Sequence, residues 1–236
     1  MPTVSSESFS KTDDARVRRS ALFGLVAQRP CWVPTWRGWL VVFLLSLLLF
    51  TGIITGVHPF LAVNDPRPGG NLVIEGWAAD AAFQQTIAEY ERHPYERLIS
   101  TGGPLEKGAP LIGYETLAEV GAATFRKLRP DLRELYAVPA PKVRQDRTYA
   151  SAVALKEWLR ERGQLPAKIN LVSGGPHSRR SRLLFQKAFG ADAEIGIIAM
   201  EDDTYDAKRW WTSSQGFRIV TSEIIAYLYA RFFFWP

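Results

Sequence analysis

Residues 39–57 read WLVVFLLSLLLFTGIITGV, a run of nineteen residues without a charged side chain. The hydrocarbon core of a bilayer is about 30 Å thick, and a helix of about 20 mostly apolar residues crosses it. A helix on the surface of a soluble protein keeps a polar face, which this run lacks. The run therefore predicts one transmembrane helix over residues 38–58, between an N-terminal tail and a larger C-terminal domain.

The charges beside the span predict its orientation. Residues 1–37 carry six basic and three acidic side chains, and basic flanks stay on the cytoplasmic side of a membrane. We therefore expect a cytoplasmic tail (1–37) and a periplasmic or equivalent extracytoplasmic domain on the inner (plasma) membrane. The alternative is a cleaved signal peptide, but the charged region and the apolar run are long for one, and no A-x-A site follows.

Composition limits the function of the C-terminal domain. The tail accounts for +3 of the formal charge of +5, so the domain carries only about +2. Nucleic-acid binding, which requires a strongly basic face, is not expected. Cys31 is the only cysteine and precedes the span, so no disulfide is expected in the domain.

The remaining sequence predicts an α/β domain. A Pro/Gly-rich linker (59–70) leads into residues 71–236, where short apolar runs alternate with helical patterns. The expected strands are 71–75, 97–100, 132–138, 168–172 and 194–199, and the expected helices are 81–92 with Asp80 as N-cap, 114–128, 148–162, 178–189 and 213–233. This alternation predicts a three-layer, Rossmann-like domain with a mainly parallel sheet. Strand order is not readable, but a ligand is expected beyond the carboxyl ends of the strands.

The turn after the fourth strand is the sharpest candidate site. Glycines before a helix allow an anion to approach free backbone N–H groups, and arginines bind phosphate in a bidentate fork. The residues concerned are Ser173, Gly174, Gly175, His177, Arg179 and Arg180. They predict a bound phosphorylated ligand, with His177 as acid, base or nucleophile. The alternative is that the arginines point to solvent or pair with Glu201, Asp202 or Asp203.

Other strand ends add candidates. Glu75 closes a buried strand, where a carboxylate is costly unless it is paired or functional; we interpret it as a general base or metal ligand, or else as an ion-pair partner. Further ligand-binding candidates are Gly102, Gly103, Arg144, Arg147, Thr148 and Trp211. The alternatives are tight turns for the glycines, helix capping by Asp146 or Thr148, and core packing for Trp211. No cluster has the spacing of a metal site.

Several of these blocks resemble the ElyC/SanA/YdcF-like proteins, a bacterial family of unknown function. The resemblance covers about residues 71–229 and rests on the first strand with its turn at Gly76, Ser-x-Gly-Gly at 100–103, Arg-Thr-x-x-Ser-Ala at 147–152 and His-x-x-Arg at 177–180. The departures are Glu75-Gly76-Trp77 in place of Leu-Gly, Ser151 in place of Asn, and 174–176 in place of a Thr/Ser-rich turn.

The resemblance implies a Rossmann-like domain behind a membrane anchor. It also implies a role in envelope integrity, peptidoglycan assembly or the undecaprenyl lipid carrier, while one soluble relative is associated with S-adenosylmethionine. We expect the partners to be a bilayer and a phosphorylated small molecule or lipid-linked precursor, with phosphoester or pyrophosphate hydrolysis or transfer as the reaction class. The alternatives are a non-catalytic binding or scaffolding protein and a domain for an S-adenosylmethionine-type cofactor. The cofactor and any protein partners are not predicted.

Overall fold

The computed structural model describes residues 20–21, 26–27, 32–106 and 108–236. The chain forms two compact units, Met1–Leu48 and Leu49–Pro236, whose boundary falls within helix α1 (Trp36–Leu61). In the first unit, β1 (Ser20–Ala21) and β2 (Val26–Ala27) pair antiparallel. Most of the predicted tail, including Cys31, lies outside the described residues.

Helix α1 contains the predicted span. It is long and apolar enough to cross a membrane once, and no part of its most apolar 18-residue stretch is buried. The helix continues past the predicted end at residue 58, through Pro59 to Leu61. The first part of the expected linker is therefore helical.

The second unit contains the predicted α/β fold, and its sheet is parallel throughout. The strands are β3 (Asn71–Glu75), β4 (Arg97–Gly102), β5 (Leu135–Pro139), β6 (Ala167–Gly174) and β7 (Ala193–Met200). Their order is β5-β4-β3-β6-β7, and Val73 at the centre pairs with Ile99 on one side and Leu171 on the other. The chain thus builds the sheet outward from β3 in one direction and then restarts beside β3 with β6.

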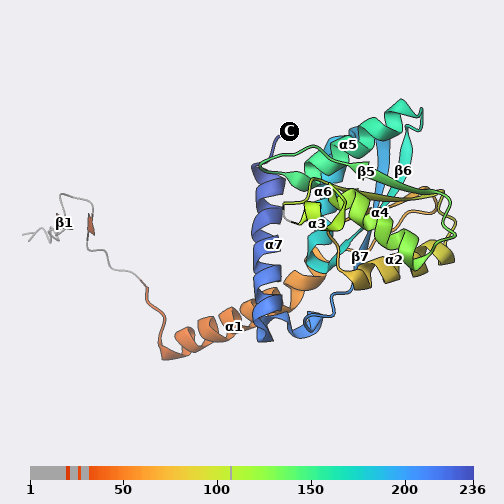
Figure 1. Cartoon of the computed structure of the whole chain (residues 1–236). Helices are drawn as coiled ribbons and strands as arrows, with labels where there is room; N and C mark the ends of the chain where they lie inside the picture. The colour runs from red at the N-terminus through yellow and green to blue at the C-terminus, as the bar shows by residue number, and fades with distance from the viewer. Residues whose placement is uncertain (1–19, 22–25, 28–31, 107) are drawn as a thin grey trace, which may run out of the picture. The chain divides into compact units, whose positions relative to one another are not determined.

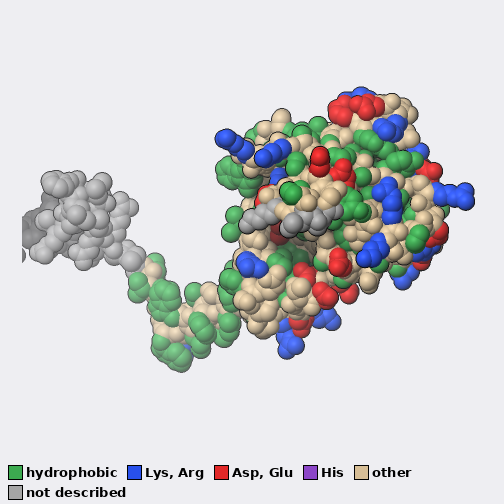
Figure 2. All heavy atoms as spheres, in the orientation of Figure 1, with side chains coloured by type: hydrophobic (Ala, Val, Ile, Leu, Met, Phe, Trp, Pro, Cys, Tyr) green, Lys and Arg blue, Asp and Glu red, His purple; other side chains and the backbone are tan. Residues whose placement is uncertain are grey.

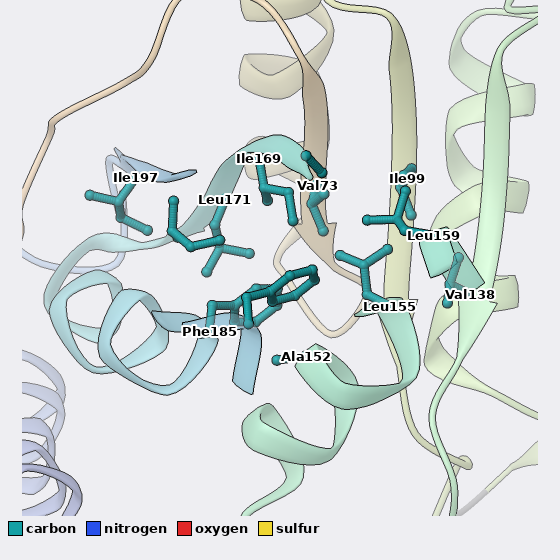
Figure 3. Packing of buried hydrophobic residues seen from close by; sticks show 13 residues of the cluster. Val73, Ile99, Val138, Ala152, Leu155, Leu159, Ile169, Leu171, Phe185 and Ile197 are labelled. Atoms are coloured by element: carbon teal, nitrogen blue, oxygen red, sulfur yellow. The ribbon is translucent and has the colours of Figure 1, made fainter. Parts of the chain in front are cut away.

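Helices cover both faces of this sheet (Figure 1). The helices of the second unit are α2 (Asp80–Arg92), α3 (Ala109–Ile112), α4 (Leu117–Leu128), α5 (Arg147–Glu161), α6 (Ser178–Phe189) and α7 (Ser214–Phe232), with 3-10 turns η1 (Gly175–His177), η2 (Gly190–Asp192) and η3 (Ala207–Thr212). α2 and α4 pack on one face through Phe83 and Phe125. α5 and α6 pack on the other, where Leu155 and Phe185 meet strand residues such as Val73 (Figure 3). Alternation along the strands supplies both faces with apolar side chains.

Two helix starts differ from the prediction. α4 begins at Leu117 rather than at residue 114, because Thr116 and Glu119 form a reciprocal capping box just before it. α2 begins at Asp80 itself, and its N-cap residue is Ala79 without a side-chain capping bond. The predicted N-cap role of Asp80 is therefore wrong.

Residues 62–70, which we call the strap, are docked on the domain rather than free as a spacer. Asp65 bridges Ile197 on the outer edge of β7, with hydrogen bonds in both directions. The side chain of Asn170, buried in β6, accepts a bond from the Arg67 N–H at 2.6 Å and donates to the carbonyls of Arg67 and Gly69, both at 2.9 Å. The strap therefore joins α1 to the sheet along a fixed path.

Candidate functional site

A cavity of about 990 Å³ lies where the carboxyl ends of the strands meet α5, α6 and α7. Glu75, at the end of β3, lies beside β6, and this is the point where the strand order reverses. Ligands of open α/β sheets bind at such a switch point. The predicted site residues that line the cavity are Glu75, Gly102, Gly103, Arg144, Arg147, Thr148, His177 and Arg180.

Glu75 is held at the base of the cavity by hydroxyl groups. Its side chain is only 3% exposed. Oε2 accepts hydrogen bonds from Ser173 Oγ at 2.8 Å and Ser181 Oγ at 3.0 Å, and Oε1 accepts one from Thr148 Oγ1 at 3.3 Å. Burial raises the pKa of Glu75, but the positive charge of His177 and the hydrogen bonds from Ser173 and Ser181 lower it overall. Glu75 is therefore ionised at neutral pH and is a weak base.

His177 lies between two carboxylates. Its Nε2 is 3.5 Å from Glu75 Oε2, and its Nδ1 is 2.9 Å from Glu223 Oε1 on α7. Burial lowers the pKa of His177, but the nearby Glu75 charge and the hydrogen bond between Nδ1 and Glu223 outweigh this effect and raise the pKa to about 9. Trp77 covers the ring edge-on, with centroids 4.9 Å apart. A ring protonated at neutral pH has no lone pair for nucleophilic attack, so this geometry favours acid or positioning roles.

Arg180 completes the arrangement. Its Nε donates to Glu223 Oε2 at 2.9 Å and its Nη2 to Glu223 Oε1 at 3.1 Å. Burial raises the pKa of Glu223, but hydrogen bonds from His177 and Arg180 lower it to about 2. Glu75, His177, Glu223 and Arg180 thus form a charge array with two negative and two positive groups. Arg180 therefore pairs with the carboxylate of Glu223. The alternative raised from the sequence had placed its partner among residues 201–203.

Basic side chains from the β5–α5 loop and the first residue of α5 form another wall of the cavity. Lys142, Arg144 and Arg147 line the cavity and are exposed. Arg147 pairs with Glu106 at 2.6 Å, whereas Lys142 and Arg144 have no salt-bridge partner in the described part of the chain. This wall, which we call the basic rim, leaves positive charge available to a ligand.

The start of α5 strengthens the positive potential of the basic rim. Asp146 is the N-cap residue in a left-handed conformation (φ 56°) and makes no side-chain capping bond. The predicted capping by Asp146 or Thr148 is therefore not observed; Thr148 bonds to Glu75 instead. The positive end of the helix dipole favours an anion near these uncapped N–H groups.

Five predicted ligand-binding residues do not line this cavity: Ser173, Gly174, Gly175, Arg179 and Trp211. Ser173 lies behind Glu75 and orients it. Arg179 turns away, donates to the Phe60 carbonyl and places its guanidinium 4.0 Å from the Phe60 ring. Trp211, on η3, packs edge-on against Trp210. The basic wall of the cavity thus follows β5 rather than β6, where the sequence placed it.

Three site residues were missed from the sequence: Trp77, Lys142 and Glu223. Glu223 is the only charged residue in residues 219–230. A lone carboxylate in an apolar helix is seldom buried without a partner, and this signal was available. The partners of Glu223 could not be predicted from the sequence, because His177 lies 46 positions away in the chain.

Comparisons give no relative for this chain: no family model, no curated protein and no solved structure matches it. Within the described residues, no group of three or more His, Cys, Asp and Glu side chains could hold a metal ion. The site must therefore be interpreted from its own geometry.

Proposed function

We propose that this chain is a membrane-anchored, extracytoplasmic protein of cell-envelope biogenesis whose cavity binds a phosphorylated ligand. The observation that carries the ligand class is the basic rim, where Lys142 and Arg144 line a large cavity and form no salt bridge with any carboxylate of the described residues. Guanidinium groups bind phosphate bidentately, and a lysine adds a mobile point charge. The envelope role, in peptidoglycan or undecaprenyl-phosphate metabolism, rests on the anchor and on the resemblance to ElyC/SanA/YdcF-like proteins.

The reaction class we propose is hydrolysis or transfer of a phosphoester or pyrophosphate. Arg144 and Arg147 would stabilise charge that develops on the phosphoryl oxygens. A water molecule, or the hydroxyl of an acceptor in a transfer, would attack phosphorus and form the new P–O bond. Protonated His177 would give its proton to the leaving oxygen as the old P–O bond breaks, and Thr148 would position the ligand beside Glu75. Thr148 contacts Glu75 and lines the cavity, so it connects the rim to the charge array.

The ligand class is tested with the full chain in detergent by titration calorimetry against inorganic pyrophosphate and a polyprenyl phosphate. Arg144→Gln and Arg147→Gln should each weaken binding about tenfold, a loss of about 1.4 kcal/mol. Arg160→Gln is the matched control, because Arg160 belongs to α5 and pairs with Glu157 outside the cavity. Equal losses in all three variants, or no binding of either compound, would refute the proposal.

The charge array favours a second candidate, a non-catalytic binding or scaffolding protein of the envelope. His177 and Arg180 are already neutralised by Glu75 and Glu223, so both are committed to the folded structure. This candidate predicts binding without turnover. Phosphate release from pyrophosphate or from the polyprenyl phosphate by the full chain, abolished in His177→Gln, would favour the enzyme instead.

A further inference from the structure

The outer side of α7 is apolar along most of its length. Phe217, Ile225, Leu228 and Phe232 are exposed, and Ile225 and Phe232 are 68% and 61% accessible. Their successive spacings of eight, three and four residues place them on one stripe of a helix. Figure 2 shows hydrophobic side chains along the edge where Figure 1 places α7, most densely near its C-terminal end.

The polar groups near this stripe are satisfied within the helix. Thr221 Oγ1 donates to the Phe217 carbonyl at 2.6 Å, and Ser222 Oγ donates to the Ile219 carbonyl at 3.0 Å. Glu223 faces the other way, into the charge array. From residue 219 to 230 the helix therefore presents no charged group outward, while Arg218 and Arg231 flank this stretch.

The chain end extends the same surface. Phe234 is held on the domain, edge-on to Tyr149 at 5.1 Å, and Lys187 Nζ bonds to its carbonyl. This contact leaves Phe233 and Trp235 exposed, the latter at 81%. Aromatic residues of this kind are enriched where membranes meet water.

The last turns of α1 pack against α7. Ile54, Val57 and Leu61 form a cluster with residues of α7 and η3 that include Val220. Trp210 Nε1 donates to the Ile54 carbonyl at 3.0 Å, which fixes the contact. A chain that crosses a bilayer through α1 therefore leaves it directly beside α7.

We propose that the outer stripe of α7, with Phe233 and Trp235, lies in the bilayer interface as an in-plane amphipathic helix. Such helices bury an apolar face about 5–10 Å into the headgroup boundary. We choose the bilayer as the partner of this stripe because α1, which packs against α7, would cross the bilayer beside it. Arg218 and Arg231, at the two ends of the stripe, are suited to contact anionic headgroups. The inference rests on α1 crossing the membrane and is independent of the ligand in the cavity.

The test uses nitroxide labels on the full chain in vesicles of phosphatidylethanolamine and phosphatidylglycerol. Cys31 is replaced by serine, and Ile225→Cys, Phe232→Cys and Glu161→Cys are labelled one at a time. Both α7 positions are exposed, so a label there disturbs no packing, and the exposed Glu161 at the end of α5 is the control. The ratio of accessibility to oxygen over accessibility to a water-soluble nickel chelate should be several-fold higher at 225 and 232 than at 161.

Two results would overturn the inference. Equal ratios at all three positions would show that the stripe faces water. Shielding from both reagents at 225 and 232, together with dipolar broadening between labels of different molecules, would show that a second copy of the chain covers it.

Discussion

The central residue of the site is His177, whose two ring nitrogens both face carboxylates. Replacing Glu223 by glutamine removes the negative charge that faces Nδ1 of His177 and leaves Arg180 with one acceptor oxygen in place of two. We expect the pKa of His177 to fall from about 9 and the free energy of unfolding to drop by about 3 kcal/mol, as for other broken buried ion pairs. NMR titration of the three histidines and chemical denaturation measure the two effects.

Glu89→Gln is the control for this substitution, because it removes the carboxylate 3.0 Å from the exposed His93. It should leave the His177 titration unchanged. A His177 that titrates near 6.5 in the unmodified chain would contradict the description of the charge array.

The titration of His177 makes the stability of the folded chain depend on pH. The pKa of His177 is about 9 in the folded chain against an ordinary value of 6.5, so folding favours the protonated ring. The stabilisation is complete below about pH 6.5 and is lost as the pH rises through 9, by on the order of 1–3 kcal/mol. Thermal melting of the full chain should therefore show a decrease in Tm over this interval. His177→Gln should flatten the decrease and His93→Gln should preserve it; the reverse pattern would disprove the assignment.

At the scale of elements, the strap depends on one buried side chain. Asn170→Ala removes the acceptor of the Arg67 N–H and the donor to the carbonyls of Arg67 and Gly69. Because a fully buried polar group left unpaired costs about 1–3 kcal/mol and these three backbone groups are partly buried, we expect a total loss of about 2 kcal/mol. Hydrogen exchange at the Arg67 amide should accelerate strongly.

Gln85→Ala is the comparison for the strap, since Gln85 also makes two hydrogen bonds to backbone, both to exposed Glu201. It should change neither the stability nor the exchange at Arg67 appreciably. Unchanged exchange in Asn170→Ala would mean that the bridge between Asp65 and Ile197 holds the strap alone.

The elements themselves were largely predictable, because apolar runs and helical periodicity are local. β3 and α6 have the predicted bounds, and the predicted strand 132–138 begins three residues before β5. Strand order was not predictable, because it depends on contacts between segments far apart in the chain. The site was predictable in part for the same reason: Glu75 and His177 follow strands, whereas Glu223 comes from a helix that closes the cavity from the side.

At the scale of the whole molecule, the proposed orientation makes a direct prediction. An alkaline phosphatase fused after Pro236 should be active in a bacterial host, because that enzyme folds only outside the cytoplasm, whereas the same enzyme inserted after Pro34 within the full chain should be inactive. Fluorescent-protein fusions at the two positions should give the opposite pattern. An active phosphatase at Pro34 with an inactive one at Pro236 would place the domain in the cytoplasm and favour the S-adenosylmethionine-type alternative. The basic residues of 1–37 are the physical reason for the expected result.

The docked strap also has a consequence for biosynthesis. β7 is the last strand to leave the ribosome, and its outer edge closes on Asp65, which was made more than a hundred residues earlier and is tethered by α1. The nascent chain must therefore insert its final strand between β6 and a segment already in place. An open strand edge invites pairing with other chains, and the edge of β6 stays open until synthesis of β7 is complete. A transcript truncated before β7 should accordingly yield a product that quality-control proteases remove at the membrane.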